Sequence, residues 1–145
     1  LNGQDVTGEL RTPEMSDYAS KISALKVVRD VLLDLQRDLA RTRNVVMDGR
    51  DIGTVVLPRA NVKIFLTASP EVRAKRRLLE LQEKGDKKAS FDKVLQEIRQ
   101  RDKRDETRAV APLKCAPDAV RLDNSELTIE ESAAAMEKIV KERLG

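Results

Sequence analysis

Arginine and aspartate are the side chains of this sequence best suited to bind a phosphorylated ligand. Arg101, Asp105 and Arg108 follow one another at spacings of four and three residues, so a helix would carry them on one face. The apolar residues from Phe91 to Ile98 lie on the same face. Charged residues thus continue the side of the helix that faces the core, which predicts that they line a cavity. In such a cavity, arginine binds phosphate oxygens and aspartate accepts hydrogen bonds from sugar hydroxyls. Alternatively, the helix leaves the core and its charges form solvated pairs.

The segment 48–54 is a second candidate, because it follows an apolar run that predicts a buried strand at 45–47. In open α/β sheets, ligands bind beyond the carboxyl ends of the strands. There Arg50 would fork onto phosphate oxygens, and Asp51 would accept a hydrogen bond from a base amino group or from a hydroxyl. Asp48, which ends the run, would lie near Mg²⁺ and contact it through water. The alternative is an ordinary turn in which Asp51 caps the next helix.

A third group of cations, Arg73, Arg76 and Arg77, lies on one side of a predicted helix. Like charges at such spacings cost about 0.2 to 0.5 kcal/mol per pair, a cost that a bound anion would reverse. Gly85 and a lysine-rich loop follow this helix. The segment near 70–90 therefore predicts a mobile lid that brings arginines to a polyphosphate. A plain solvated face is the alternative interpretation.

Composition restricts both the chemistry and the location. The 145 residues are enough for one compact domain, and hydrophobic residues make up 40% of them. The sequence has no histidine, which excludes histidine metal sites and imidazole acid–base catalysis. Its single cysteine excludes an internal disulfide, and no apolar run is long enough to span a membrane. We therefore expect a cytoplasmic protein whose chemistry uses Asp, Glu, Arg, Lys or hydroxyl groups.

Helices and strands alternate along the chain. Thr12 and Ser69 are predicted N-caps, and Thr128 with Glu131 forms a predicted capping box. Leucines and valines at spacings of three and four predict that the helix over 25–43 packs one face on the core. Helices are predicted over 12–24, 25–43, 69–84, 90–111 and from 128 onward, and strands over 45–47, 62–67 and 119–123. This order predicts an α/β fold with a parallel sheet and flanking helices.

Four separated segments resemble bacterial cytidylate kinases and occur in the same order as in that family. They are Asp5-Val6-Thr7 with Leu10-Arg11-Thr12, then 48–56, 63–66 and 101–113. The resemblance covers nearly the whole chain. It implies a P-loop nucleoside monophosphate kinase-like fold that transfers the γ-phosphoryl group of ATP to CMP or dCMP with Mg²⁺.

The resemblance also implies roles for individual residues. Those expected to read the cytosine base are Ser20, Arg29 and Asp51. Arg50 and Arg108 would bind the acceptor phosphate, and Arg101 and Asp105 would contact the sugar. Arg73 and Arg77 lie where the lid of the family contacts ATP. The residues expected to stabilise charge during phosphoryl transfer are Arg50, Arg108, Arg77 and Arg73.

By the same resemblance, residues 1–44 are the latter part of the monophosphate-binding insert and its return helix. Residues 45–145 are the remainder of the kinase core, with the lid near 70–90. The family's G-x-x-G-x-G-K-[ST] loop, which holds the ATP phosphates, does not occur in the chain and would lie before Leu1. We expect a fold incomplete at the N-terminus and a chain that is inactive alone. An unpaired sheet edge would let it self-associate, whereas the full-length protein is expected to be a monomer.

Two other functions stay open at this point. A basic nucleic-acid-binding module would place lysines and arginines on phosphates, but the net charge is only +3. Aromatic residues, on which such modules stack bases, make up 2% of the chain. A non-catalytic structural fragment is consistent with the missing phosphate loop. Binding of CMP rather than RNA would decide between these alternatives.

Overall fold

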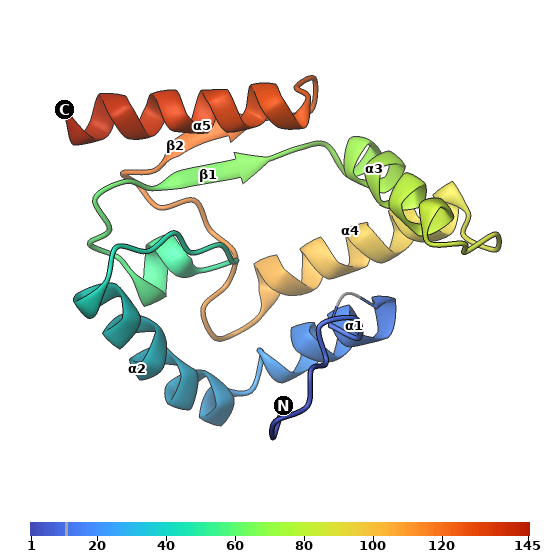
Figure 1. Ribbon diagram of the computed structural model, residues 1–145, viewed down its shortest axis with the longest axis horizontal. Coiled ribbons are helices and arrows are strands. Elements are labelled where there is room, and N and C mark those ends of the chain that lie inside the picture. The colour runs from blue at the N-terminus through green and yellow to red at the C-terminus, as the bar shows by residue number, and fades with distance from the viewer. Residues whose placement is uncertain (11) are drawn as a thin grey trace.

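The computed structural model describes residues 1–10 and 12–145 (Figure 1). Arg11, which belongs to the N-terminal motif 10–12, lies outside the described residues. The elements are, in chain order, α1 (Pro13–Ile22), α2 (Lys26–Thr42), η1 (Ile52–Val56), β1 (Ile64–Thr67), α3 (Pro70–Glu83), α4 (Phe91–Thr107), β2 (Val120–Asp123) and α5 (Ile129–Leu144). The element η1 is a single π-helical turn.

The described sheet consists of β1 and β2, which pair in parallel with Ile64 opposite Val120 and Thr67 opposite Asp123. In Figure 1, α5 lies along the two strands, and α3 and α4 form a helical hairpin beyond the end of β1. The helices α1 and α2 lie on the other side of α4 from α5. The chain therefore has the predicted α/β fold, with a small parallel sheet and flanking helices.

The predicted caps of α1, α3 and α5 are confirmed, whereas Ser90 at the start of α4 makes no capping hydrogen bond through its side chain. The side chain of Thr12 accepts a hydrogen bond from the Met15 amide, and Ser69 caps α3 in the same way. Thr128 and Glu131 form the reciprocal capping box of α5. The predicted end of α4 near residue 111 is wrong, because the helix ends at Thr107 and the chain turns away through residues 108–111.

The strand predicted at 45–47 is wrong. These residues form neither helix nor strand, and Val46 is fully exposed. A strand needs a neighbour to accept its backbone hydrogen bonds. In the part of the chain that the structure describes, β1 and β2 pair only with each other, so this run has no ladder to join.

The helix at 26–42 is confirmed, but its leucine stripe does not pack on a core. Leu25, Leu32, Leu35 and Leu39 are between 40% and 59% exposed. The periodicity correctly predicted an amphipathic helix, but it cannot say whether a partner for the apolar face exists within the same chain. The residues that are buried and hydrophobic lie elsewhere and are few: Val56, Ala68, Ala74, Val94 and Ala116. Among the described helices, none is both long and apolar enough to cross a lipid bilayer.

Candidate functional site

Asp51 is the centre of a buried ion-pair cluster. Its carboxylate accepts a hydrogen bond from Arg29 Nη2 on Oδ2 and one from Arg108 Nη2 on Oδ1, the latter at 3.4 Å. The three side chains come from α2, the segment before η1 and the end of α4. Their exposed fractions are 16% for Arg29, 10% for Asp51 and 8% for Arg108. Asp51 occupies the N-cap position of η1, but its side chain makes no capping hydrogen bond to that turn.

The backbone around Asp51 is held by η1 and by Arg37, a residue that sequence reasoning missed. The carbonyl of Asp51 accepts hydrogen bonds from the amides of Val55 and Val56. The guanidinium of Arg37, on α2, donates to the carbonyls of the same two valines at 2.9 and 3.1 Å. In the sequence, Arg37 is one of several charged residues in a polar helix, and no pattern distinguishes it.

Asp105 is the centre of a second cluster on α4. Arg50 Nε donates to Asp105 Oδ2 at 2.9 Å, and Arg101 Nε lies 3.8 Å from the same oxygen. The side chain of Asp105 is 5% exposed, so the charged end of the predicted stripe does face inward. The alternative of fully solvated pairs is wrong for this part of the helix.

Arg101 contains a buried donor that no acceptor satisfies. Among the buried side-chain nitrogen and oxygen atoms of the described residues, Arg101 Nε is the one that makes no hydrogen bond. Burial, and next the nearby charge of Arg50, lower the pKa of Arg101 from its usual value. An anion between Arg50 and Arg101 would satisfy this donor and offset the charge of Arg50.

Ser20 is buried on α1 although its helix is polar. Its Oγ accepts a hydrogen bond from Arg104 Nη1 on α4 at 3.2 Å, and the same nitrogen lies 3.3 Å from Asp17 Oδ1. The hydroxyl of Ser23 donates to the Ser20 carbonyl, and Arg29 Nη1 donates to the Ser23 carbonyl at 3.2 Å. Ser20 is thereby connected through Arg29 to the Asp51 cluster.

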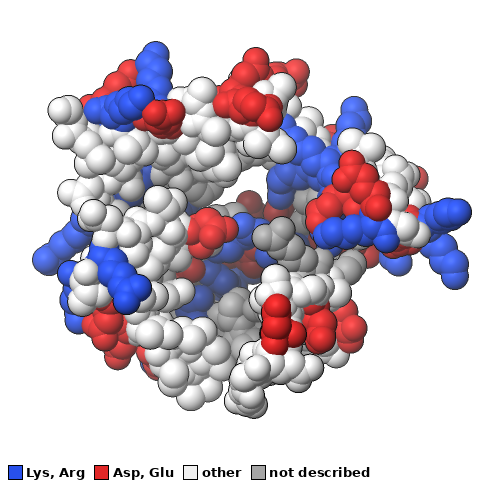
Figure 2. Space-filling model, viewed as in Figure 1, with Lys and Arg blue, Asp and Glu red and all other residues white. Residues whose placement is uncertain are grey.

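These contacts connect α1, α2, the 48–51 segment and α4 in a closed series that begins and ends on α4. Its members are Arg104, Ser20, Ser23, Arg29, Asp51 and Arg108. Figure 2 shows that this face of the molecule is hollowed at its centre, with basic side chains inside the hollow. The predicted residues Ser20, Arg29, Arg50, Asp51, Arg101, Asp105 and Arg108 therefore all belong to two neighbouring clusters at the end of α4.

The arginines of the predicted lid are bound within the protein. Arg73 forms a two-pronged pair with Asp102 on α4 at 2.9 and 2.6 Å, and its Nε donates to the Ala68 carbonyl. Arg76 donates to Asn124 and to the Leu127 carbonyl, in the loop after β2. Two of the three cations therefore connect α3 to neighbouring segments, Arg73 from a half-buried position and Arg76 from an exposed one.

Arg77 differs from the other two lid arginines. It pairs with Glu80 on its own helix at 2.7 Å, and Glu80 also accepts from Lys84 at 2.6 Å. Because Lys84 can keep Glu80 neutralised, Arg77 is the arginine of this group that is most easily released to another anion.

Asp48 is exposed and stands apart from the two clusters. Within residues 1–10 and 12–145, no group of three or more Asp, Glu, Cys or His side chains could hold a metal ion. Mg²⁺ usually keeps several waters and is held by one or two carboxylates together with the phosphates of its substrate, so the expected water-mediated role of Asp48 stays a prediction.

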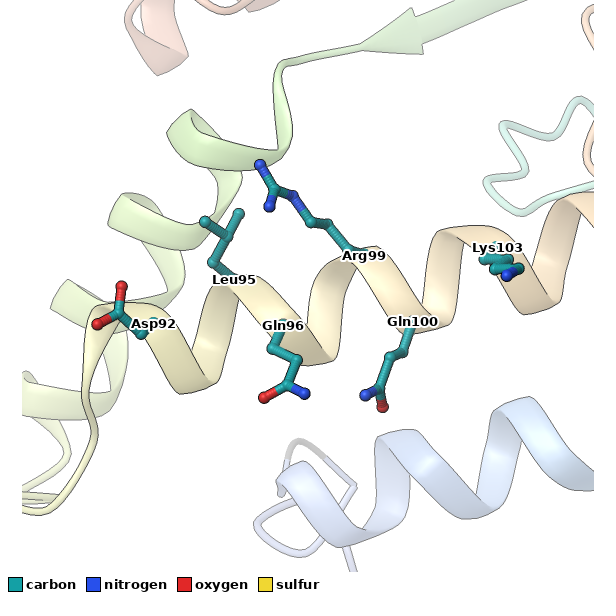
Figure 3. A pocket seen from close by; sticks show the side chains of 6 residues that line it. All are labelled: Asp92, Leu95, Gln96, Arg99, Gln100 and Lys103. Carbon is teal, nitrogen blue, oxygen red and sulfur yellow. The ribbon is translucent and has the colours of Figure 1, made fainter.

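A separate open hollow of 420 Å³ is lined by residues of α4. In Figure 3, Leu95 and Arg99 point toward α3, and Gln96 and Gln100 point away from it. The lining of the hollow also includes Asp92 and Lys103. All six residues come from one helix, and none of them was predicted as a site residue.

A small parallel sheet with flanking helices, and an arginine-lined centre at the end of α4, agree with a nucleoside monophosphate kinase-like architecture. Residues 1–142 match the family model described as cytidylate kinase. The cytidylate kinase of Caldicellulosiruptor saccharolyticus is 55% identical over 131 residues, which are 90% of this chain and 58% of that protein. That of Geobacter sulfurreducens is 54% identical over 142 residues, 98% of this chain and 60% of the relative. That of Thermosipho melanesiensis is 52% identical over 143 residues, with corresponding shares of 99% and 65%.

The chain belongs to the cytidylate kinase family. The resemblance noted from its motifs is therefore confirmed over nearly all of its length. The chain spans 58% to 65% of the length of the curated relatives to which it was compared.

Proposed function

We propose that this chain contributes the acceptor half of a cytidylate kinase, an enzyme that transfers the γ-phosphoryl group of ATP to CMP or dCMP. The observation that carries the proposal is the buried, unsatisfied Nε of Arg101 beside the charge of Arg50. A phosphate or sugar oxygen would satisfy that donor and offset the excess positive charge. Family membership supplies the identity of the nucleotide.

In this proposal the two clusters hold different parts of the monophosphate. Arg50, Arg101 and Asp105 hold the phosphate and sugar, with Arg108 as a second phosphate ligand. Ser20, Arg29 and Asp51 face the base. The helices α1 and α2 belong to the monophosphate-binding insert, which we assign to residues 1–44. Arg29 and Arg108 occupy both oxygens of Asp51 in the structure, so a base amino group would displace or share one of these contacts.

Phosphoryl transfer depends mainly on positioning and charge stabilisation, which arginines supply without proton transfer by histidine. Arg50 and Arg108 would orient the acceptor phosphate, and Arg77 would approach the donor phosphates when the lid closes. ATP brings Mg²⁺ on its phosphate oxygens, where the ion neutralises developing charge. The chain itself contains no G-x-x-G-x-G-K-[ST] sequence to cradle ATP. We therefore expect it to bind CMP without forming CDP when tested alone.

The exposed leucines of α2 and the exposed Val46 support a further part of the proposal, self-association of the isolated chain. Sedimentation velocity over a range of protein concentrations tests this point. A single species at the mass of one chain across that range would contradict it. A cytoplasmic location, where nucleotide pools are phosphorylated, completes the proposal.

Calorimetric titration of the 145-residue chain with CMP, UMP and ATP in turn tests the proposed function, after circular dichroism has shown that the chain is folded. We expect CMP to bind more tightly than UMP and ATP to bind weakly. A folded chain that binds neither monophosphate would contradict the assignment of the two clusters to the acceptor.

A further inference from the structure

The π-helical turn η1 and the residues after it are held by two cations from different elements. Arg37, on α2, donates to the carbonyls of Val55 and Val56 at 2.9 and 3.1 Å. Lys63, the residue before β1, donates to the carbonyl of Pro58 at 2.5 Å, two residues after η1 ends. In Figure 1, η1 lies between α2 and the start of β1. The carbonyls that a helical turn leaves without partners at its end are therefore satisfied from both neighbouring elements.

The ammonium group of Lys63 is fixed in one place. Its side chain is only 7% exposed, although it is charged and lies in the apolar run 62–67. Besides the Pro58 carbonyl, Lys63 Nζ binds both carboxylate oxygens of the exposed Asp118, at 2.9 and 2.7 Å. A buried ammonium group needs such partners, because burial deprives it of the hydrogen bonds of water. Lys63 thus joins the segment after η1 to the loop before β2.

The methylene groups of Lys63 also pack against η1 itself. A Cβ atom added at Gly53, within η1, would lie 3.4 Å from Lys63 Cδ and 3.8 Å from Ala116 Cβ. On the other side of the site segment, a Cβ atom at Gly49 would lie 2.9 Å from Ile52 Cγ1, which is too close for any side chain. The chain from 49 to 53 is therefore closely packed, and a shift of η1 would move the residues just before it.

Those residues are Arg50 and Asp51, which are consecutive in the sequence but belong to different clusters. The carbonyl of Asp51 accepts hydrogen bonds from the amides of Thr54, Val55 and Val56, at 3.3, 2.9 and 3.3 Å. Three bonds to one carbonyl connect the backbone of Asp51 directly to η1. The position of η1 therefore sets where both clusters receive their side chain from this segment.

We propose that Lys63 is a positioning residue for the acceptor site: by holding η1 against the start of β1, it fixes the segment that presents Arg50 and Asp51 to the monophosphate. The proposal rests on the proposed function, because it assumes that these two residues bind a monophosphate. The side-chain hydrogen bonds of Lys63 go to Pro58 and Asp118 and not to either cluster, so it acts through η1. A site that is already held in its binding geometry loses less free energy when the ligand binds.

Hydrogen exchange, followed by NMR, tests whether Lys63 holds η1. The amides to observe are those of Thr54, Val55 and Val56, in the unmodified 145-residue chain and in Lys63→Met. Methionine keeps an unbranched apolar stem over Gly53 but has no donor. We expect the three amides to exchange about tenfold faster in Lys63→Met and the amides of α5 to keep their rates. The same acceleration in α5 would mean that Lys63 only stabilises the whole fold, and the proposal would be wrong.

Calorimetric titration with CMP tests whether this support matters for binding. We expect Lys63→Met to lower CMP affinity by about threefold to tenfold, because the nucleotide then binds a state that is populated only part of the time. Lys63→Arg keeps a charged donor near Pro58 and should restore most of the affinity. A variant with arginine that binds CMP as weakly as Lys63→Met would contradict a role for the charged donor.

Asp118→Asn carries the test if circular dichroism shows that Lys63→Met does not fold. It weakens the hold on the ammonium group at an exposed position and leaves the Pro58 contact in place. We expect the amides of Thr54, Val55 and Val56 to exchange about threefold faster in this variant. Unchanged exchange of these amides in folded Asp118→Asn would overturn the proposal.

Lys26→Met is the matched control. Lys26 also forms an ion pair, with Asp30 at 2.6 Å, but both residues lie on the exposed surface of α2. The substitution removes the same ammonium group from a lysine that does not contact η1. We expect it to change neither the exchange of the three amides nor the affinity for CMP.

The outcomes separate the two proposals. If the unmodified chain does not bind CMP, the proposed function fails and this inference fails with it. If the chain binds CMP and Lys63→Met speeds exchange in η1 without lowering the affinity, the proposed function stands and the positioning role of Lys63 is wrong. If Lys63→Met lowers the affinity without changing exchange in η1, Lys63 does not act through this turn, and the proposal is overturned.

Discussion

Arg50 and Asp105 are 55 residues apart in the sequence, yet Arg50 Nε donates to Asp105 Oδ2 at 2.9 Å. Arg101 approaches the same oxygen at 3.8 Å. One buried carboxylate is therefore shared by two guanidinium groups, which leaves an excess of positive charge at the end of α4. This excess is the electrostatic basis of an anion site, because the two guanidinium groups already lie together at Asp105 and need little rearrangement to bind.

Asp105→Asn should lower the free energy of unfolding by about 2 kcal/mol, since removal of one partner leaves buried charge uncompensated. The value is below that of a fully buried pair because the side chain of Arg50 is 41% exposed. Urea unfolding measures the effect. Asp38→Asn is the control, since Asp38 forms an exposed pair with Arg41 on α2 and should change stability by less than about 0.5 kcal/mol. Equal effects of the two substitutions would show that the Asp105 cluster contributes no more to the free energy of unfolding than an exposed ion pair does.

Arg108→Ala should reduce CMP affinity by at least about tenfold, because a charge-assisted hydrogen bond to phosphate contributes about 1.5 to 3 kcal/mol. Titration calorimetry on the folded variant gives the value. Arg41→Ala, at an exposed position of α2, should leave the affinity unchanged. Unchanged affinity in Arg108→Ala would remove Arg108 from the acceptor site.

The sequence predicted those parts of the fold that depend on neighbouring residues. Thr12, Ser69 and the Thr128 capping box act within one turn of a helix, so their spacing is enough to predict them. The inward direction of Asp105 was also predictable, because a helix fixes which residues share a face. The position of the two strands followed from short apolar runs bounded by turn residues.

What the sequence could not predict depends on partners far along the chain. The stripe of α2 has the periodicity of a packed helix whether or not a partner covers it, and Leu35 is 59% exposed. Val46 likewise needs a neighbouring strand that the described chain does not provide. Arg37 and Arg104 act on residues 18 or more positions away, and a charged residue in a polar helix gives no sign of such a partner.

Arg73→Ala should destabilise the fold more than Arg77→Ala, because Arg73 holds neighbouring elements together whereas Arg77 can leave its partner. Arg73 makes three hydrogen bonds to Asp102 and Ala68, and its pKa is raised chiefly by the hydrogen bond to Asp102. Its loss should cost about 2 kcal/mol of unfolding free energy, whereas loss of Arg77 should cost less than about 0.5 kcal/mol. Thermal and urea unfolding of both variants measure the difference. If Arg77→Ala lowered the free energy of unfolding more than Arg73→Ala, Arg77 and not Arg73 would be the arginine that stabilises the fold.

Arg37→Ala should lower the free energy of unfolding by about 2 kcal/mol, because two carbonyls lose a charged donor. These carbonyls belong to Val55 and Val56, and Val56 is 3% exposed. Arg41→Ala, one turn further along α2, is the matched control and should cost less than about 0.5 kcal/mol. Since Arg37 fixes the segment that carries Asp51, CMP affinity should fall as well. Loss of stability with full CMP affinity would show that the segment is held by other contacts.

Glu80 should make stability depend on acid pH. Hydrogen bonds from Lys84 and then from Arg77 lower its pKa from 4.5 to about 2. Because the folded-state pKa lies below the unfolded value, the ionised group stabilises the fold above the unfolded pKa, and this contribution is lost as pH falls from 4.5 toward 2. Solvent screens the pair, since the side chain is 42% exposed, so the contribution is about 0.5 to 1 kcal/mol.

Glu80→Gln should therefore be less stable than the unmodified chain at neutral pH, and the difference should shrink steadily as the pH is lowered through this range. Urea unfolding at a series of pH values measures it. Glu83→Gln, at an exposed position of the same helix, is the control and should follow the unmodified chain throughout. A difference that stays constant down to the lowest pH would mean that the negative charge of Glu80 does not stabilise the fold. Glu80 would then act through packing or neutral hydrogen bonds, which protonation of its carboxylate leaves in place.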